Sequence, residues 1–282
     1  MKAARRQSGF TLIEMLVVIS ILAILAGLAV PALKNLGKSN VTVSAARQLL
    51  DDVGRARQLA IANHATVYMV FVPTNFWTGN GGNFLNTSQW WQNLTVAQQT
   101  AVTNLADQQL SGYNFISYGK VGDQPGQHAW HYLSTWQSLP QGTFISPKKF
   151  YWPVQPLQFT PVAGGQTFSI SQFLTRNDIP FPTEQSTNYN NVVSLPWIAF
   201  NYQGQLTTNG VDVVTYHELI PLAQGSVYPA LNGNKQLQLG NAAASSPSVQ
   251  LIPSGNDTSI SYNLVDIDPL TGRASLEFYK IP

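Results

Sequence analysis

Residues 9–34 read GFTLIEMLVVISILAILAGLAVPALK, and this run carries most of the information in the sequence. Between Met15 and Leu33 the only polar side chain is Ser20. A helix over those residues is about 28 Å long at 1.5 Å per residue, close to the roughly 30 Å hydrocarbon core of a bilayer. The run therefore predicts a membrane-spanning helix over residues 10–34. The helix is preceded by three basic residues, Lys2, Arg5 and Arg6. These residues predict a cytoplasmic N-terminus.

Two ordinary explanations of this segment leave part of it unexplained. A secretory signal peptide has an apolar region of about 7–15 residues, whereas this one is longer and begins with an embedded acid, Glu14. A plain signal anchor accounts for the length but not for Glu14. A carboxylate at the centre of a membrane helix costs about 2.5–3.5 kcal/mol, and less near the interface. An acid at this depth predicts a functional role and a partner of opposite charge.

The run from Gly9 to Glu14 resembles the cleavage and methylation motif of type IV prepilins and pseudopilins. The resemblance implies that a prepilin peptidase cuts between Gly9 and Phe10 and methylates the new amino group of Phe10. Glu14 and Pro31 match the family's glutamate and its helix-kinking proline. Glu14 is then expected to pair with the free amine of a neighbouring subunit's Phe10, which offsets two buried charges.

The sequence after the apolar run predicts an α+β head. Apolar residues at three- and four-residue spacing predict an amphipathic helix over residues 43–63, and a β-rich run follows at residues 66–72. Gly37, Ser39 and Asn40 are expected to weaken the helix before that point. A long helix whose second half packs on an antiparallel sheet is the pilin-like architecture. The phrase ARQLAIANHATVYMVF, within residues 45–72, also resembles the H-type minor pseudopilins.

The predicted organisation has four parts and one insertion. They are a leader at 1–9, a membrane helix at 10–34, its amphipathic continuation at 35–63, and a periplasmic head at 64–282 with an insertion at about 74–191. Inside the insertion we predict a polar helix at 96–110 and a strand at 113–118. Beyond it we predict strands at 195–202, 210–216 and 248–252, and a hairpin formed by 259–267 and 273–281.

The composition excludes several classes of function. Charged residues make up only 10% of the chain, against about 25% in typical soluble proteins, so no basic surface for nucleic acid is expected. No cysteine is present, which removes disulfides and thiolate chemistry. No nucleotide-binding, hydrolase or zinc-protease motif occurs. We therefore expect no enzyme and no cofactor.

Four groups of residues are candidate sites. His128-x-x-His131 lacks nearby acids and is weak evidence for a metal, and His217-Glu218 could be an acid/base pair or merely a strand end. Asp266 and Asp268, before Thr271-Gly272, faintly resemble a calcium loop, although turn chemistry explains them better. Aromatic residues crowd the insertion and form either a binding surface or its own core: Trp77, Trp90, Trp91, Trp130, Trp136, Trp152, Tyr113, Tyr132 and Tyr151.

The resemblance and the composition together predict a structural subunit. We expect a minor pseudopilin of a type II secretion or related filament, anchored in the bacterial inner membrane with its head in the periplasm. Its expected partners are other pilin or pseudopilin subunits, prepilin peptidase, the inner membrane and possibly a secreted substrate, but no nucleic acid. The alternative is a membrane-anchored carbohydrate- or protein-binding module. Exposed aromatics in the insertion would favour this alternative, and buried aromatics would favour the scaffold.

Overall fold

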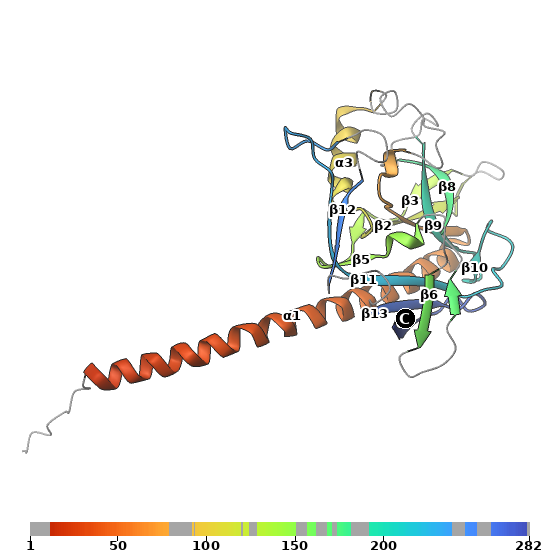
Figure 1. The fold of residues 1–282 in the computed structure, drawn as a ribbon. Helices are drawn as coiled ribbons and strands as arrows, with labels where there is room; N and C mark the ends of the chain where they lie inside the picture. Colours follow the sequence, from red (N-terminus) through yellow and green to blue (C-terminus); the bar gives the residue numbers. More distant parts are fainter. Residues whose placement is uncertain are drawn as a thin grey trace, which may run out of the picture. The chain divides into compact units, whose positions relative to one another are not determined.

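The computed structural model describes residues 12–78, 92, 94–119, 121–123, 129–150, 157–161, 168–170, 174–181, 192–238, 246–252 and 261–280. The chain divides into two compact units, residues 1–41 and residues 42–282. Figure 1 shows the elements along the chain.

Helix α1 is a single helix of 52 residues, Leu12–Asn63. It is continuous through Gly37, Ser39 and Asn40, so these residues do not interrupt it. The helix ends where His64 takes a left-handed conformation, with φ of 47°. The amphipathic helix predicted over residues 43–63 is therefore confirmed as the last part of α1.

The first part of α1 exposes its apolar side chains in the isolated chain. Between Leu12 and Leu25 the large apolar residues are 46% to 84% exposed. In the part of the chain that the structure describes, no helix is long and apolar enough to cross a membrane. Phe10, Thr11 and the side chains of residues 26–40 lie outside the described residues. The span over residues 10–34 therefore stays a prediction.

Two antiparallel sheets form the second unit, which makes the fold α+β as expected. The first sheet contains β1 (Thr66–Phe71), β2 (Gly112–Tyr118), β3 (Trp130–Tyr132), β4 (Gln137–Ser138), β8 (Thr175–Pro180), β9 (Val192–Phe200) and β10 (Leu206–Thr207). The second contains β5 (Thr143–Ile145), β6 (Leu157–Pro161), β7 (Phe168–Ile170), β11 (Glu218–Tyr228), β12 (Ser248–Leu251), β13 (Ser261–Ile267) and β14 (Ala274–Lys280). The short helices are η1 (Phe76–Thr78), α3 (Val96–Ala106) and η2 (Pro147–Lys149).

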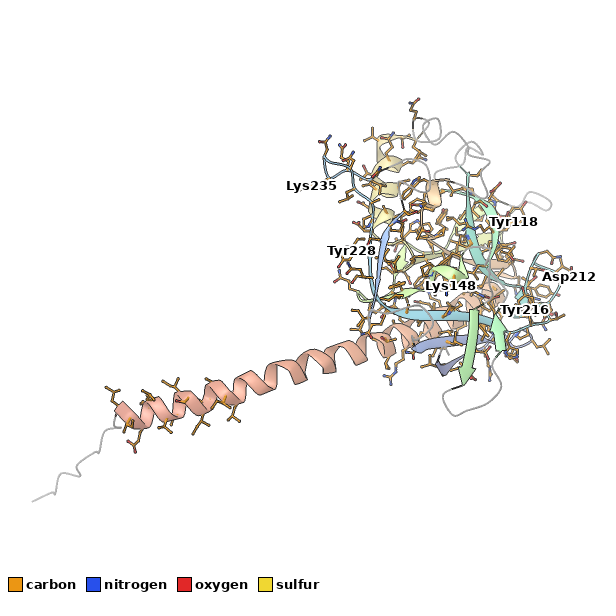
Figure 2. The ribbon with its side chains drawn as sticks, in the orientation of Figure 1. Tyr118, Lys148, Asp212, Tyr216, Tyr228 and Lys235 are labelled. Carbon is orange, nitrogen blue, oxygen red and sulfur yellow. The ribbon has the colours of Figure 1, made fainter. Side chains whose placement is uncertain are left out.

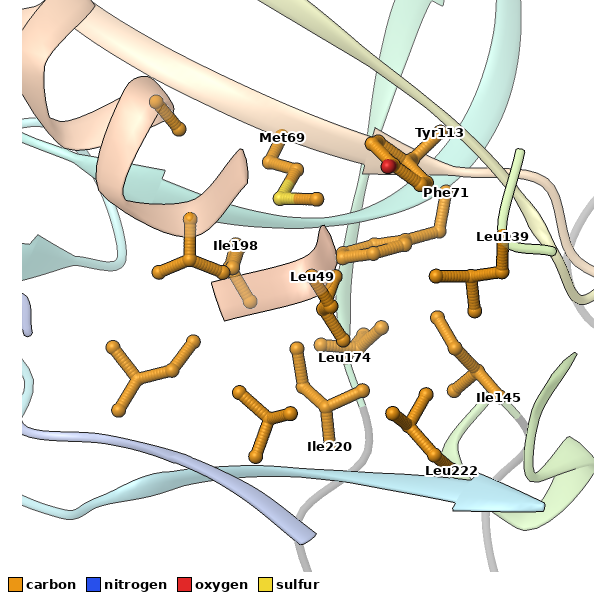
Figure 3. Packing of buried hydrophobic residues seen from close by; sticks show 14 of the residues in the cluster. Leu49, Met69, Phe71, Tyr113, Leu139, Ile145, Leu174, Ile198, Ile220 and Leu222 are labelled. Atoms are coloured by element: carbon orange, nitrogen blue, oxygen red, sulfur yellow. The ribbon is translucent and has the colours of Figure 1, made fainter. Parts of the chain in front are cut away.

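The main core lies where α1 meets both sheets. Figure 3 shows Leu49 of α1 between Met69 and Phe71 of β1 and Ile220 and Leu222 of β11. The buried residues of α1 recur at three- and four-residue spacing, which places them on one face of the helix: Ala45, Ala46, Leu49, Val53, Ala56 and Ala60. Burying this face against two sheets supplies the main hydrophobic stabilisation of the second unit.

A second core covers the opposite face of the first sheet. Successive side chains of a strand point to opposite faces, so Tyr68 and Val70 lie in this second core while Met69 and Phe71 lie in the main one. Helix α3 and η1 close the second core with Val102, Phe76, Trp77 and their neighbours. Because both faces of β1 are buried, its sequence is a continuous apolar run rather than an alternating one.

Most predicted elements are confirmed, and one is wrong. Strands are present at 66–71, 112–118, 192–200 and 248–251, and the C-terminal hairpin pairs β13 with β14. The polar helix ends at Ala106, four residues earlier than expected, and begins with a capping box between Thr95 and Gln98.

The strand predicted over residues 210–216 does not form. The side chain of Asn209 accepts hydrogen bonds from the backbone N–H groups of Val211 (2.9 Å) and Asp212 (2.8 Å), which turns the chain instead. Only Val213 makes a single bridge there, to Thr207. Strand β11, by contrast, was not predicted, because Pro221 and Gly225 interrupt its pattern.

The segment from 74 to 191 contributes to both sheets. Its strand β2 pairs with β1 in the first sheet, and its strand β5 pairs with β11 in the second. The described part of this segment therefore supplies strands to both sheets of the head.

Candidate functional site

The N-terminal end of α1 carries the residues that the sequence assigns to assembly. Glu14 lies in the first turn of the helix, where the unpaired backbone N–H groups favour a negative charge. Glu14 is exposed in the isolated chain. Pro31 lies within α1, and its side chain is outside the described residues, as are Gly9 and Phe10.

The surface around Glu14 is apolar on all sides of the helix. Its members are Leu12, Ile13, Met15, Leu16, Val17, Val18, Ile19, Ile21, Leu22, Ile24 and Leu25, all exposed. Ser20 adds no free polar group, because its hydroxyl donates to the carbonyl oxygen of Leu16 at 2.5 Å. Burying one such side chain is worth about 1.5–3 kcal/mol, so a helix that is apolar all round requires a lipid or protein environment.

Comparison with known proteins identifies this segment. A family model described as the prokaryotic N-terminal methylation motif matches residues 4–30. The chain carries a prepilin-type methylation motif. This motif implies processing by a prepilin peptidase, anchoring to a membrane and assembly with other pilin subunits, and it indicates a structural subunit rather than an enzyme. A search of curated proteins and a search of solved structures found no match to the chain.

A hydrogen-bonded cluster joins α1 to the first sheet. The hydroxyl of Tyr113 on β2 donates to the carboxylate of Asp52 and accepts from Nε2 of Gln48 at 2.7 Å. Burial, and then the hydrogen bond to Asp52, raise the pKa of Tyr113 well above its usual range. Sequence reasoning missed this cluster, because nothing in the local pattern shows that Tyr113 would face two residues of a distant helix.

A buried ion pair ties η2 to β11. The ammonium group of Lys149 contacts a carboxylate oxygen of Glu218, and the two side chains are 1% and 10% exposed. His217, next along the chain, instead places Nδ1 2.8 Å from a carboxylate oxygen of Asp266 and is 54% exposed. The two neighbours therefore have separate partners, and this geometry does not support an acid/base pair of His217 and Glu218.

Of the two carboxylates that faintly resemble a calcium loop, Asp268 serves the C-terminal turn. Asp268 accepts hydrogen bonds from the backbone N–H (2.7 Å) and the hydroxyl (2.8 Å) of Thr271. These bonds lower the pKa of Asp268. Among the described residues no group of three or more His, Cys, Asp or Glu side chains could hold a metal ion. Turn formation, the favoured explanation, accounts for Asp268.

The other histidine motif is only partly described. His131 lies on β3 with Nε2 3.1 Å from a carboxylate oxygen of Asp123. His128 lies outside the described residues. His131 therefore has a carboxylate partner, and within the described ranges no further ligand set surrounds it.

The described aromatic residues of the insertion are mostly buried. Trp77 is 3% exposed and Tyr113 is fully buried, while Trp130, Tyr132 and Trp136 are partly buried against the second core. Tyr132 also donates its hydroxyl to the carbonyl oxygen of Pro180 at 2.5 Å. Four others lie outside the described residues: Trp90, Trp91, Tyr151 and Trp152. The burial favours a scaffolding role over an exposed aromatic binding surface.

Proposed function

We propose that this protein is a minor pseudopilin, a structural subunit of a type II secretion or type IV pilus-like filament. The observation that carries the proposal is the methylation motif at residues 4–30, followed by an apolar helix that continues into an α+β head. The motif supplies a processing site, the exposed helix supplies a surface for neighbouring subunits, and the head has its own core.

The physical chemistry of the helix supports anchoring in the membrane first and assembly into a filament afterwards. Before assembly, the inner membrane covers the apolar side chains of residues 12–25, with the basic leader in the cytoplasm and the head in the periplasm. In the filament, the helices of neighbouring subunits take over that covering. Glu14 then pairs with the methylated amino group of Phe10 on the adjacent subunit, the cation that arrives at the same depth. The H-type likeness of residues 45–72 supports a position at or near the filament tip.

Processing gives the direct test. The mature protein extracted from the membrane should begin at Phe10, with one methyl group on its amine, as measured by intact-mass and N-terminal fragment spectrometry. Gly9→Ala should be tolerated far better than a bulky residue at position 9, because the peptidase of the family prefers a small residue there. A mature chain that starts at Met1, or beyond Pro31, would overturn the proposal.

A further inference from the structure

The chain contains three Asn-Gly pairs, and the structure describes two of them, Asn209-Gly210 and Asn232-Gly233. Both asparagines are exposed and lie in loops. Figure 2 shows the two loops on opposite sides of the head, marked by Asp212 and Lys235. An asparagine that precedes glycine is readily attacked at its side-chain amide by the next backbone nitrogen, because glycine has no Cβ atom to hinder the approach. The two pairs share this chemistry and differ in the contacts that the fold gives them.

The loop around Asn232 holds the side-chain amide in a reactive arrangement. Oδ1 of Asn232 accepts hydrogen bonds from the backbone N–H groups of Asn234 and Gln236, both at 2.9 Å. Two N–H donors at a carbonyl oxygen stabilise the negative charge that develops there when a nucleophile adds to the carbon. The N–H of Gly233 has no hydrogen-bond partner among the described residues, so its nitrogen loses its proton without breaking a contact. The space beside Gly233 is open to water, since a Cβ atom built there would meet nothing within 4 Å.

The loop around Asn209 restrains the same two reacting groups. The N–H of Gly210 donates to Oγ1 of Thr207 at 2.8 Å. Nδ2 of Asn209, the group that would leave, donates to a carboxylate oxygen of Asp212 at 2.7 Å. Nδ2 of Asn232, by contrast, makes one long hydrogen bond of 3.4 Å. Because Oδ1 of Asn209 also accepts two backbone N–H groups, the two sites differ at the nucleophile and the leaving group rather than at the oxygen.

From this difference, we infer that Asn232 is a site of spontaneous deamidation in the folded protein and that Asn209 is protected. The nitrogen of Gly233 gives its proton to hydroxide and adds to Cγ of Asn232, which forms a new C–N bond and an oxyanion at Oδ1. The oxyanion collapses, the bond from Cγ to Nδ2 breaks, and Nδ2 takes a proton from water and leaves as ammonia. Water then opens the cyclic imide at either carbonyl, which gives aspartate or isoaspartate at position 232.

The products change the charge and the backbone path of this loop. Either product places a carboxylate three residues before Lys235. Isoaspartate also adds one carbon to the backbone inside the loop that the bridge between Leu231 and Leu237 closes. The loop lines an open hollow of about 660 Å³ beside the C-terminal end of α3, so deamidation alters this surface of the head. The reaction uses no residue of the methylation motif, so its test is independent of the proposed function.

Ageing of the purified full-length protein in detergent at mildly alkaline pH tests the inference. Peptide mapping by mass spectrometry measures aspartate and isoaspartate at each site, and Asn209 is the control within the same molecule. In the folded protein, Asn232 should convert at least about fivefold faster than Asn209, because its cyclisation breaks fewer hydrogen bonds. In concentrated urea the two rates should converge, because both sites lose their contacts. A ratio that is equal in folded and unfolded protein, or faster conversion at Asn209 in the folded protein, would overturn the inference.

Two substitutions test the two backbone nitrogens separately. Gly233→Ala fits the open space at that position and should slow conversion at Asn232 several-fold, because a methyl group hinders the attack. Thr207→Val removes the oxygen that holds the N–H of Gly210, so conversion at Asn209 should rise several-fold while Asn232 keeps its rate. Circular dichroism checks that each variant is folded, and Gly233→Ala decides alone if Thr207→Val does not fold. An unchanged rate at Asn232 in Gly233→Ala, or at Asn209 in folded Thr207→Val, would overturn the inference.

Discussion

Tyr113 shows what a single residue does in this head. Its ring lies in the main core, while its hydroxyl joins β2 to Asp52 and Gln48 on α1. The hydroxyl satisfies two polar side chains of the helix at once. Because those groups are only partly buried, its removal should weaken the head without unfolding it.

Tyr113→Phe should lower the free energy of unfolding by about 1–2 kcal/mol at pH 8, because Asp52 and Gln48 lose their common partner. The same variant should be less sensitive to high pH. Folding raises the pKa of Tyr113 above its ordinary value of 10.0, so its contribution is fully present below pH 10 and is lost as the pH rises through the folded-state pKa. Denaturant titrations of both proteins at pH 8 and pH 11 measure the difference. An equal loss in both between the two pH values would contradict the prediction.

Glu14→Leu belongs to the same scale. The substitution removes a carboxylate from the apolar end of α1, so membrane insertion and processing should proceed at least as well as in the unaltered chain. Incorporation into filaments should fall several-fold or more, because the pair with Phe10 of the next subunit is lost. Cross-linking of assembled filaments measures this, with Met15→Leu as the apolar control. Assembly and secretion at unaltered levels would show that Glu14 does not dock the subunit.

At the scale of elements, the C-terminal hairpin is held close to the turn after β9. Gly272, in the turn between β13 and β14, has φ of 61°, and a Cβ atom built on it would lie 2.0 Å from the carbonyl oxygen of Gly204. Nearby, Nε of Arg57 on α1 donates to the carbonyl oxygen of Thr271 at 2.8 Å. The hairpin turn, the β9–β10 turn and α1 therefore meet at one point.

Gly272→Ala should destabilise the head by about 2–3 kcal/mol, because alanine resists the left-handed conformation and its methyl group displaces Gly204. Gly233→Ala is the matched control. A Cβ atom at Gly233 meets nothing within 4 Å, so that change should stay within about 0.5 kcal/mol. Thermal denaturation of the two variants measures the loss of stability in each. An equal loss in both would mean that the turn at Gly272 is not held tightly.

At the scale of the whole molecule, the head has the cores needed to fold alone. Residues 42–282 form one compact unit with two hydrophobic cores, and the exposed apolar side chains at residues 12–25 lie outside it. A fragment from Val43 to Pro282 should melt cooperatively and remain monomeric without detergent, whereas the full chain should associate. Circular dichroism and light scattering test this. A fragment that shows no cooperative transition and binds hydrophobic dye would place the boundary elsewhere.

Local signals were strong enough to predict helix α1 and strand β1. The spacing of Leu49, Val53 and Ala56 predicts the buried face of α1, and the run after Ala65 predicts β1. Local signals were misleading in the turn at Asn209, where a side chain competes with the backbone for hydrogen bonds. They were too weak to predict β11, because Pro221 and Gly225 interrupt its local pattern. Its pairing partners, β5 and β13, are distant in the sequence.

By itself, the sequence determined the processing motif, the apolar helix and the α+β class, because each depends on residues that are close together in the chain. Tertiary structure alone decided which aromatics are buried, that the segment after Thr74 is built into both sheets, and that Glu218 pairs with Lys149 rather than acting with His217. The physical reason is that burial and partnership are set by contacts between segments far apart in the chain, which no local spacing records.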